Sequence, residues 1–246
     1  MIEMIWESAA LTDRGRKRKH NEDALVALPR NGVFVVADGM GGHAAGDVAS
    51  QMLTDAVAAM GTDIPFPSFV DRFDDTMIGV NRQIRAHADE HFGGKTMGST
   101  VVAMLVQGEV GVCMWAGDSR LYRVRDGEML QVSRDHDPLE DLVESGQLTP
   151  EEADDHPDSS VITRAVGGSP DLHLDIITFD VLPGDVYLLC SDGLYREVER
   201  DELHQVLGNE DPVDGTADRL MNLALERGAR DNISLIVARC REKDDD

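Results

Sequence analysis

The apolar residues of this chain are concentrated in short continuous runs, and this pattern limits the fold more than any other feature. The runs VFVVA at 33–37 and VVAMLV at 101–106 show it most clearly. A run of this length indicates a strand that is buried on both faces. The expected strands are Val33–Ala37, Thr100–Val106, Val110–Trp115, Leu121–Val124, Met129–Val132, Val186–Cys190 and Ile233–Ala238. A sheet built from such strands must be covered on both sides.

Two long helices are expected one after the other. Apolar residues recur on one helical face in the stretch from Ala45 to Met60, and again over Phe69–Ala88. Shorter helices are expected at Leu139–Ser145, Pro150–Asp154, Glu202–Leu207 and Thr216–Arg227. Because the strands cluster and the long helices are consecutive, the order argues against regular βαβ alternation. It favours an α+β sandwich.

The chain is expected to form a single domain over residues 1–240, followed by an acidic tail at 241–246. Within the domain, an acidic segment at about 134–163 has little strand signal and interrupts the strands on either side. We expect this segment to form a flap over a site; the alternative is a solvated insertion on the surface.

Charge and cysteine content narrow the function classes. With 47 acidic and 23 basic side chains, the formal net charge is −24, which argues against general nucleic-acid binding. No apolar run approaches the ~20 residues that a membrane helix needs, and Met1–Leu11 does not resemble a signal peptide. The three cysteines lie in apolar, strand-like segments and are expected to be buried thiols. We therefore expect a cytoplasmic, monomeric protein that binds neither nucleic acid nor membranes.

Aspartates recur at the ends of the expected strands. Asp38, Asp118 and Asp192 each follow an apolar run, and Asp231 comes just before one. An acidic pair, Glu22–Asp23, lies near the N-terminus. Several carboxylates at the rim of a core are the ligands that hard divalent cations prefer. Each aspartate alone is weak support, because Asp126–Gly127 in this same chain indicates only a hairpin turn.

A basic residue that can bind phosphate accompanies the acidic pair. Arg18 lies three residues before Asn21, so its guanidinium group and the carboxylates can share one site. Arginine suits a phosphate because its planar fork donates two parallel hydrogen bonds. The alternative is an ordinary surface arginine within the basic run Arg14–Lys19.

Seven motifs in series resemble those of a known family. They are TDRGRKRKHNED, VVADGMGGHAAGDVAS, MGSTVV, WAGDSRLYR, SRDH, LLCSDGL and RDNIS. Their order resembles that of the bacterial type-2C metal-dependent Ser/Thr protein phosphatases, the PPM family, over about residues 5–240. The resemblance implies a four-layer α-β-β-α sandwich, in which two antiparallel sheets are flanked by helices. Several separated motifs in order are far more specific than any single one.

The resemblance also implies two Mn²⁺ or Mg²⁺ ions at one end of the sandwich. Asp38 would bridge both ions, and the backbone carbonyl of Gly39 would bind one of them. Asp192 and Asp231 would hold the other.

The remaining acidic residues would have supporting roles in that family. Glu22 and Asp23 would act largely through bound water, and Asp118 would share a third ion with Asp192. Arg18 matches the residue that holds the substrate phosphate. Residues 134–163 correspond to the variable flap beside the site.

The implied activity is hydrolysis of phosphoserine and phosphothreonine in proteins. A hydroxide that bridges two divalent ions would attack phosphorus directly, without a phosphoenzyme. The partners would be phosphorylated proteins, namely a Ser/Thr kinase or its substrates. The proton donor stays open: Met40 stands where eukaryotic relatives carry a histidine, and His43, His136 or a metal-bound water are the alternatives.

The sequence suggests three other interpretations. Cys190 and Arg196 fit the Cys-x5-Arg spacing of cysteine-dependent phosphatases, but a leucine precedes the cysteine and Asp192 would oppose a thiolate. Gly94–Lys95–Thr96 is similar to part of a nucleotide-binding loop, but the required upstream glycine is Asp89. The alternative of a different class is a pseudophosphatase, a regulatory module that binds phosphoprotein without turnover.

Overall fold

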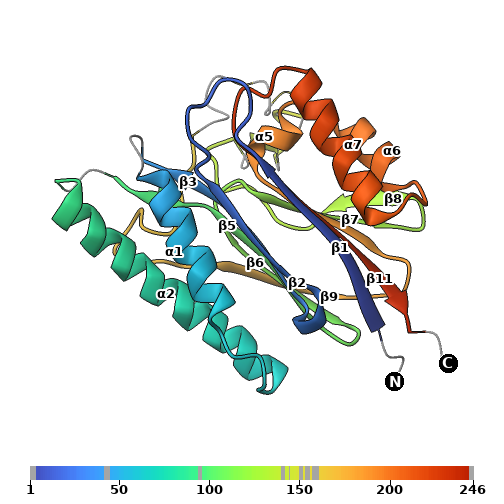
Figure 1. The fold of residues 1–246 in the computed structure, drawn as a ribbon, viewed down its shortest axis with the longest axis horizontal. Coiled ribbons are helices and arrows are strands. Elements are labelled where there is room, and N and C mark those ends of the chain that lie inside the picture. Colours follow the sequence, from blue (N-terminus) through green and yellow to red (C-terminus); the bar gives the residue numbers. More distant parts are fainter. Residues whose placement is uncertain are drawn as a thin grey trace.

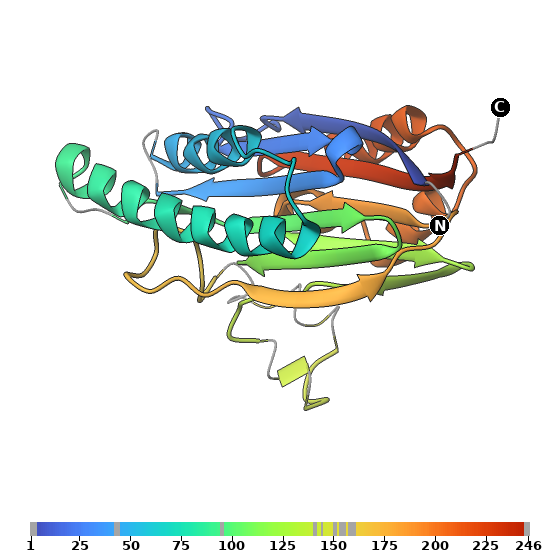
Figure 2. The ribbon, with the colours of Figure 1, turned by 90° about the horizontal axis from the view of Figure 1, so that it is seen from below.

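The computed structural model describes residues 4–41, 45–93, 96–139, 142–143, 145–149, 152, 156 and 161–243. In this part of the chain, two antiparallel sheets pack face to face and helices flank them on both sides (Figure 1). The α+β sandwich with two antiparallel sheets is therefore confirmed. Figure 2, turned by 90°, shows described residues of the segment 134–163 projecting away from the sheets.

The first sheet has five strands and the second has six. The first is ordered β1 (Met4–Asp13), β11 (Ile233–Glu242), β10 (Val186–Cys190), β7 (Arg120–Arg125) and β8 (Glu128–Gln131). The second is ordered β2 (Asp23–Leu28), β3 (Val33–Met40), β5 (Val101–Gln107), β6 (Val110–Ala116) and β9 (Asp175–Asp180), with β4 (Gly98–Ser99) paired to β3. The helices are η1 (Pro29–Asn31), α1 (Gly46–Ala58), α2 (Phe66–His91), α5 (Asp192–Tyr195), α6 (Arg200–Leu207) and α7 (Val213–Glu226).

Three apolar layers hold the sandwich together. One lies between the second sheet and α1 with α2, one between the two sheets, and one between the first sheet and α5, α6 and α7. Strand β3 serves two of them, because successive side chains of a strand point to opposite faces. Val33 and Val35 face α1 and α2, whereas Phe34 and Val36 face the other sheet. The continuous apolar runs in the sequence are explained by this burial on both faces.

Some elements differ from the expectation. Strands β1, β2 and β9 were not expected, and they are the half-exposed strands at the edges of the sheets. The single-turn helix α5 was not expected either. β11 extends through Glu242, beyond the expected end of the domain at residue 240, because it pairs with β1 as far as Met4. Of the helix expected at 139–145, residues 142–143 are helical, while 140, 141 and 144 lie outside the described residues. Of the helix expected at 150–154, only residue 152 is described.

The long helices are not membrane helices. Within the described ranges, no helix combines the length and the apolar character that crossing a bilayer requires. The 26 residues of α2 instead bury one face that includes Phe69, Phe73 and Met77 against the sheet.

Gly39 and Gly79 give opposite expectations for the same substitution. A Cβ atom at Gly39 would lie 2.1 Å from the carbonyl oxygen of Gly46, where α1 begins. A Cβ at Gly79, inside α2, would have no described atom within 4 Å. We expect Gly39→Ala to lower the free energy of unfolding by about 1–3 kcal/mol through overpacking. Gly79→Ala should raise it by about 0.5–1 kcal/mol through helix propensity.

Urea unfolding of both variants in EDTA checks this pair without any effect of metal. Equal effects of the two substitutions would contradict the close approach of α1 to the end of β3.

Candidate metal centre

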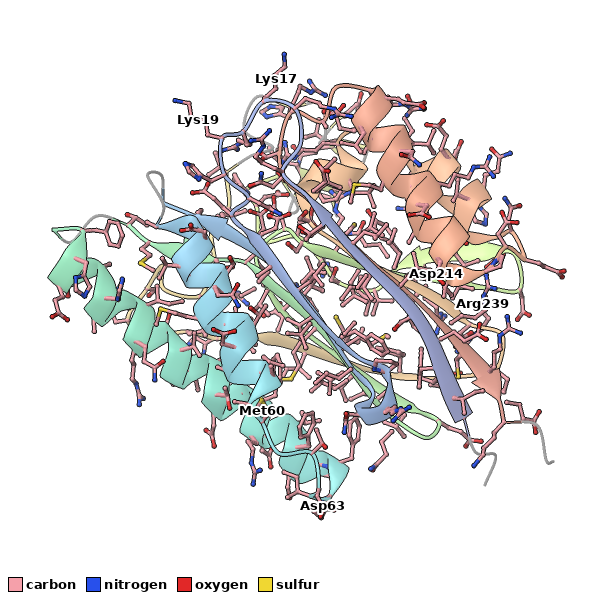
Figure 3. The ribbon with its side chains drawn as sticks, in the orientation of Figure 1. Lys17, Lys19, Met60, Asp63, Asp214 and Arg239 are labelled. Carbon is pink, nitrogen blue, oxygen red and sulfur yellow. The ribbon has the colours of Figure 1, made fainter. Side chains whose placement is uncertain are left out.

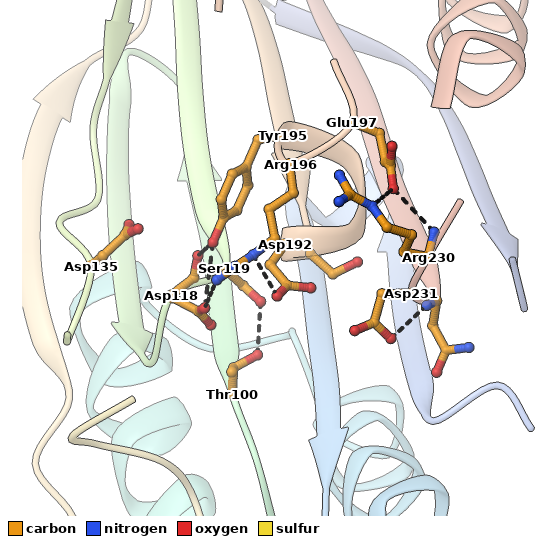
Figure 4. A network of polar contacts seen from close by, with 12 residues as sticks. Thr100, Asp118, Ser119, Asp135, Asp192, Tyr195, Arg196, Glu197, Arg230 and Asp231 are labelled. Atoms are coloured by element: carbon orange, nitrogen blue, oxygen red, sulfur yellow. Dashed lines mark hydrogen bonds and ion pairs between the residues drawn. The ribbon is translucent and has the colours of Figure 1, made fainter. Parts of the chain in front are cut away.

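Acidic side chains from both sheets meet at one end of the sandwich. Asp38 lies near the end of β3 and is the register partner of Asp23, the first residue of β2. Asp118 follows β6, Asp192 follows β10 and opens α5, and Asp231 lies two residues before β11. Figure 4 shows Asp192 between Asp118 and Asp231. The strand ends thus bring together the aspartates that the sequence singled out.

The protein environment makes these carboxylates unusually hard to ionise. Burial is the main cause that raises the pKa of Asp118 to about 7, and the negative charge of Asp192 is the next largest cause. The pKa of Asp23 is also raised to about 7, mainly by burial. The pKa of Asp38 is raised well above its ordinary range by burial and by the surrounding aspartates. Such shifts arise where carboxylates share a poorly solvated site without enough positive charge.

Hydrogen bonds hold the backbone around the cluster. The Asp38 amide donates to Thr100 Oγ1 at 3.0 Å, and Ser99 Oγ donates to the Asp38 carbonyl at 3.1 Å. Ser191 Oγ, at the end of β10 in the first sheet, donates to Asp23 Oδ2 in the second sheet at 2.8 Å. The two sheets are therefore joined through the acidic cluster itself.

Glu22 is held by its backbone. Its amide donates to Asn232 Oδ1 at 2.9 Å, and its carbonyl accepts from the Gly39 amide at 3.0 Å. Glu22 and Gly39 are thus brought to the same end of the sandwich as Asp38 and Asp231, as the sequence interpretation requires.

Two arginines supply positive charge. Arg18 Nη2 lies 2.6 Å from Asp231 Oδ2, and this hydrogen bond is the main cause of the raised pKa of Arg18. Arg196 Nε lies 2.8 Å from Asp192 Oδ2, and its Nη2 lies 3.7 Å from Asp118 Oδ2. These ion pairs hold the carboxylates in the present arrangement. In the described part of the chain, this arrangement contains no group of three or more His, Cys, Asp or Glu side chains that could hold a metal ion.

The donor set nevertheless suits divalent cations. Asp23 Oδ1 and Asp192 Oδ1 are buried and accept no hydrogen bond from the described residues. A buried carboxylate oxygen without a partner is costly, and a hard cation is the partner that carboxylates and carbonyls prefer. Because arginines occupy Asp192 and Asp231, a cation bound there would replace guanidinium contacts.

Comparison with known proteins agrees with this chemistry. The family model described as "Protein phosphatase 2C" matches residues 12–236. The chain belongs to this family. The resemblance seen in the motifs is therefore confirmed, and with it the type of sandwich.

Individual relatives of this protein phosphatase 2C chain cover nearly all of it. The serine/threonine protein phosphatase PstP of Mycobacterium tuberculosis is 37% identical over 237 residues, or 96% of this chain and 45% of PstP. The chain thus spans about half the length of that relative. PppA, a key regulatory component of T6SS in Pseudomonas aeruginosa, has a solved structure with 39% identity and a TM-score of 0.88, covering 97% of this chain and 100% of that one. The catalytic domain of PstP in complex with two manganese ions has 35% identity and a TM-score of 0.88, covering 98% and 100%.

The cysteine-dependent alternative does not fit the geometry of this protein phosphatase 2C domain. Cys190 is fully buried in β10, and its side chain lies in the apolar layer beneath α5, α6 and α7. Burial raises the pKa of its thiol far above neutrality, so the thiolate needed for attack does not form. Cys113 and Cys240 are buried free thiols too, as expected.

His43 and His136 are the two histidines that the sequence offers as proton donors. His43 lies outside the described residues. His136 accepts a hydrogen bond from the Gly117 amide through Nδ1 at 3.0 Å, and its ring is stacked on Trp115. Its Nε2 lies 3.2 Å from Asp175 Oδ2. These contacts attach the start of the segment 134–163 to β6 and β9, beside Asp118.

Sequence reasoning missed Arg196 and Tyr195 as members of the site. Tyr195 donates a hydrogen bond from its hydroxyl to the Asp118 carbonyl at 3.2 Å, and its ring stacks on the Arg120 guanidinium group, 3.6 Å from the ring centre. Arg196 lies four residues after Asp192, the spacing of an ion pair on one helical face. That spacing was available in the sequence, but it carries meaning only once α5 is known.

The raised pKa of Asp23 predicts a pH-dependent effect in the metal-free protein. An unfolded aspartate has a pKa of about 3.9, so between about pH 4 and 7 the folded state binds more protons. This carboxylate therefore lowers stability increasingly over that range. Asp23→Asn removes the titration and keeps an acceptor for Ser191. We expect the free energy of unfolding of the variant, relative to the parent, to rise from pH 4 to 8.

Urea unfolding in EDTA across this pH range measures the difference. Asp180→Asn is the control, because the hydrogen bond from Arg125 lowers the pKa of Asp180. Its stability contribution therefore changes only below about pH 4, and the variant should keep a nearly constant difference from the parent over the range measured. Parallel pH trends in the two variants would refute the assignment.

Proposed function

We propose that this chain is a Mn²⁺- or Mg²⁺-dependent protein serine/threonine phosphatase. The observation that carries the proposal is the convergence of Asp38, Asp192 and Asp231 from both sheets. Beside them, buried oxygens of Asp23 and Asp192 accept no hydrogen bond from the described residues. PstP is named a serine/threonine protein phosphatase, and its catalytic domain has been solved with two manganese ions. Both findings support the same activity here.

The acidic residues would hold two cations. Asp38 would bridge them, the Gly39 carbonyl would complete one site, and Asp192 with Asp231 would complete the other. When bound, two such ions lower the pKa of water to yield a nucleophile near neutral pH and offset charge on the phosphoryl oxygens. Glu22 and Asp23 would act through bound water, with Asp23 kept in position by Ser191.

Arg18 would bind the phosphate of the substrate. Its side chain is about half exposed and is turned towards the cluster by its bond to Asp231. A guanidinium group donates two parallel hydrogen bonds to phosphoryl oxygens and stabilises their charge in the transition state. No side chain of the site needs to become phosphorylated, and the burial of Cys190 supports direct hydrolysis.

The partners would be phosphorylated proteins, so the enzyme would oppose a Ser/Thr kinase. Three free, buried cysteines support a reducing compartment, the cytoplasm. We propose further that the domain ends near residue 240, that the enzyme is a monomer, and that residues 134–163 form a flap beside the site.

Substitution of Asp38 tests the proposed activity. We expect turnover of an aryl phosphate and a phosphothreonine peptide in Mn²⁺ or Mg²⁺ and none in EDTA. Asp38→Asn should lower kcat/KM by at least about a hundredfold, since even residues that only orient metal ligands contribute 10- to 100-fold. Asp126→Asn, on the exposed turn between β7 and β8, is the matched control and should keep full activity.

Two results would overturn the proposal. Turnover that survives EDTA but is lost on alkylation of Cys190 would indicate a cysteine mechanism. Binding of the phosphopeptide without turnover in any metal would instead indicate a phosphoprotein-binding module.

A third ion at Asp118 and Asp192 belongs to the same proposal, and Arg196 bears directly on it. The Arg196 guanidinium group contacts both carboxylates, so a third ion must displace it. We expect two ions to bind tightly and the third more weakly. Arg196→Ala should strengthen binding of the third ion by about tenfold or more, because a positive charge is removed from a poorly solvated site.

Calorimetric titration with Mn²⁺ measures the stoichiometry and affinities without relying on turnover. Arg230→Ala is the control, since Arg230 pairs with Glu197, which is not a proposed ligand. Unchanged affinity for the third ion in Arg196→Ala would contradict a competing role for Arg196.

A further inference from the structure

The loop between β1 and β2 carries most of the local positive charge beside the candidate site. It contains five basic residues in a chain whose formal net charge is −24. These residues are exposed, and they are Arg14, Arg16, Lys17, Arg18 and Lys19. Arg18 alone is accounted for by the proposed binding of phosphate. The proposed hydrolysis of the phosphate itself assigns no role to the other four basic residues.

The loop is attached to the segment that bears Asp231. Gly15 has a φ of +75°, and a Cβ atom there would lie 2.0 Å from the Asp231 carbonyl oxygen. The Arg16 amide donates to the Ala229 carbonyl at 2.8 Å. The backbone of the loop is therefore in direct contact with the segment that bears Asp231. This contact places the basic side chains at the edge of the candidate site.

The side chain of Asn232 fixes both ends of the loop. Its Nδ2 donates to the carbonyl of Arg14 at 2.8 Å and to the carbonyl of His20 at 2.9 Å. Asn232 is itself buried and directly follows Asp231. One side chain thus sets the position of the whole loop relative to a proposed metal ligand.

Within the loop, the side chains of neighbouring residues point in different directions. Arg18 turns towards Asp231, whereas Figure 3 shows Lys17 and Lys19 extending outward into solvent from the top of the molecule. A phosphate held by Arg18 would therefore have a lysine on each side of its anchor. These lysines are placed to meet the residues that flank the phosphorylated one.

We propose that Lys17 and Lys19 bind acidic side chains next to the phosphorylated residue, so that phosphopeptides with acidic flanks are the preferred substrates. The inference rests on the proposed phosphatase activity and specifies its substrate class. At physiological ionic strength, charges are screened beyond about 8 Å. A flanking carboxylate near the loop therefore responds to these lysines more than to the distant acidic surface.

The test compares two phosphothreonine peptides that differ only in their flanks, one with Asp and Glu and one with Ala. The parent enzyme should have a higher kcat/KM for the acidic peptide, and the preference should fall as salt is raised. Lys17→Gln/Lys19→Gln should lower kcat/KM for the acidic peptide about tenfold. It should leave the alanine peptide and an aryl phosphate nearly unchanged.

A second double variant controls for net charge. Arg30→Gln/Arg82→Gln removes the same charge from exposed positions. Arg30 lies in η1, which follows the end of β2 opposite to Asp23, and Arg82 lies in α2. This double variant should behave like the parent. An equal loss in both double variants would overturn the inference by indicating a general effect of net charge.

The remaining outcomes distinguish a failure of the proposed flank preference from a failure of the proposed phosphatase activity. If the parent hydrolyses both peptides equally well, the flank preference is wrong while the phosphatase activity stands. If the parent hydrolyses neither the peptides nor the aryl phosphate in any metal, the proposed function itself fails. If Lys17→Gln/Lys19→Gln weakens turnover of both peptides alike, the lysines do not read the flanks and the inference is wrong.

Discussion

Asp23, Asp38, Asp118 and Asp192 lie together at one end of the sandwich, and burial raises the pKa of each. The rest of the molecule must compensate for placing them there. Carboxylates in a poorly solvated site repel one another and lose hydration. Three separate apolar layers offset this cost with buried surface on both faces of both sheets. Arg18 and Arg196 contact Asp118, Asp192 and Asp231 directly and offset part of this charge. The negative charge that remains is what gives such a site its affinity for cations.

Strand register turns this constraint into a defined geometry. Asp23 lies opposite Asp38 because β2 and β3 pair from Leu28 with Val33 onward. A slip of one residue would exchange the faces of β3, burying Asp38 in an apolar layer. The apolar side chains therefore determine where the carboxylates lie. Ser191 adds a direct bond from β10 to Asp23, so that the spacing of the two sheets is also set at the site.

How far the sequence predicts this structure depends on the position of each strand. β3, β6, β10 and β11 are buried on both faces along most of their length, so their composition identifies them, and the aspartates next to their ends follow directly. β1 and β9 lie at the sheet edges and are only partly buried, and their residues are mixed in character. β1 is stabilised by pairing with β11 at the other end of the chain, which no local pattern reports. Arg196 was missed as a site residue because its spacing from Asp192 has meaning only once α5 is known, and because its second partner, Asp118, is distant in sequence.

The two arginines differ in what cation binding would do to them. Arg18 is held by Asp231, on the exposed side of the cluster, whereas Arg196 lies deeper, between Asp192 and Asp118. A cation that takes Asp231 as a ligand would weaken the bond that holds Arg18, and the guanidinium group would then be available to a phosphate. In the proposed phosphatase, occupation of the core site and binding of the substrate would thus favour one another. The coupling follows from Asp231 serving both partners, because one carboxylate cannot fully neutralise both.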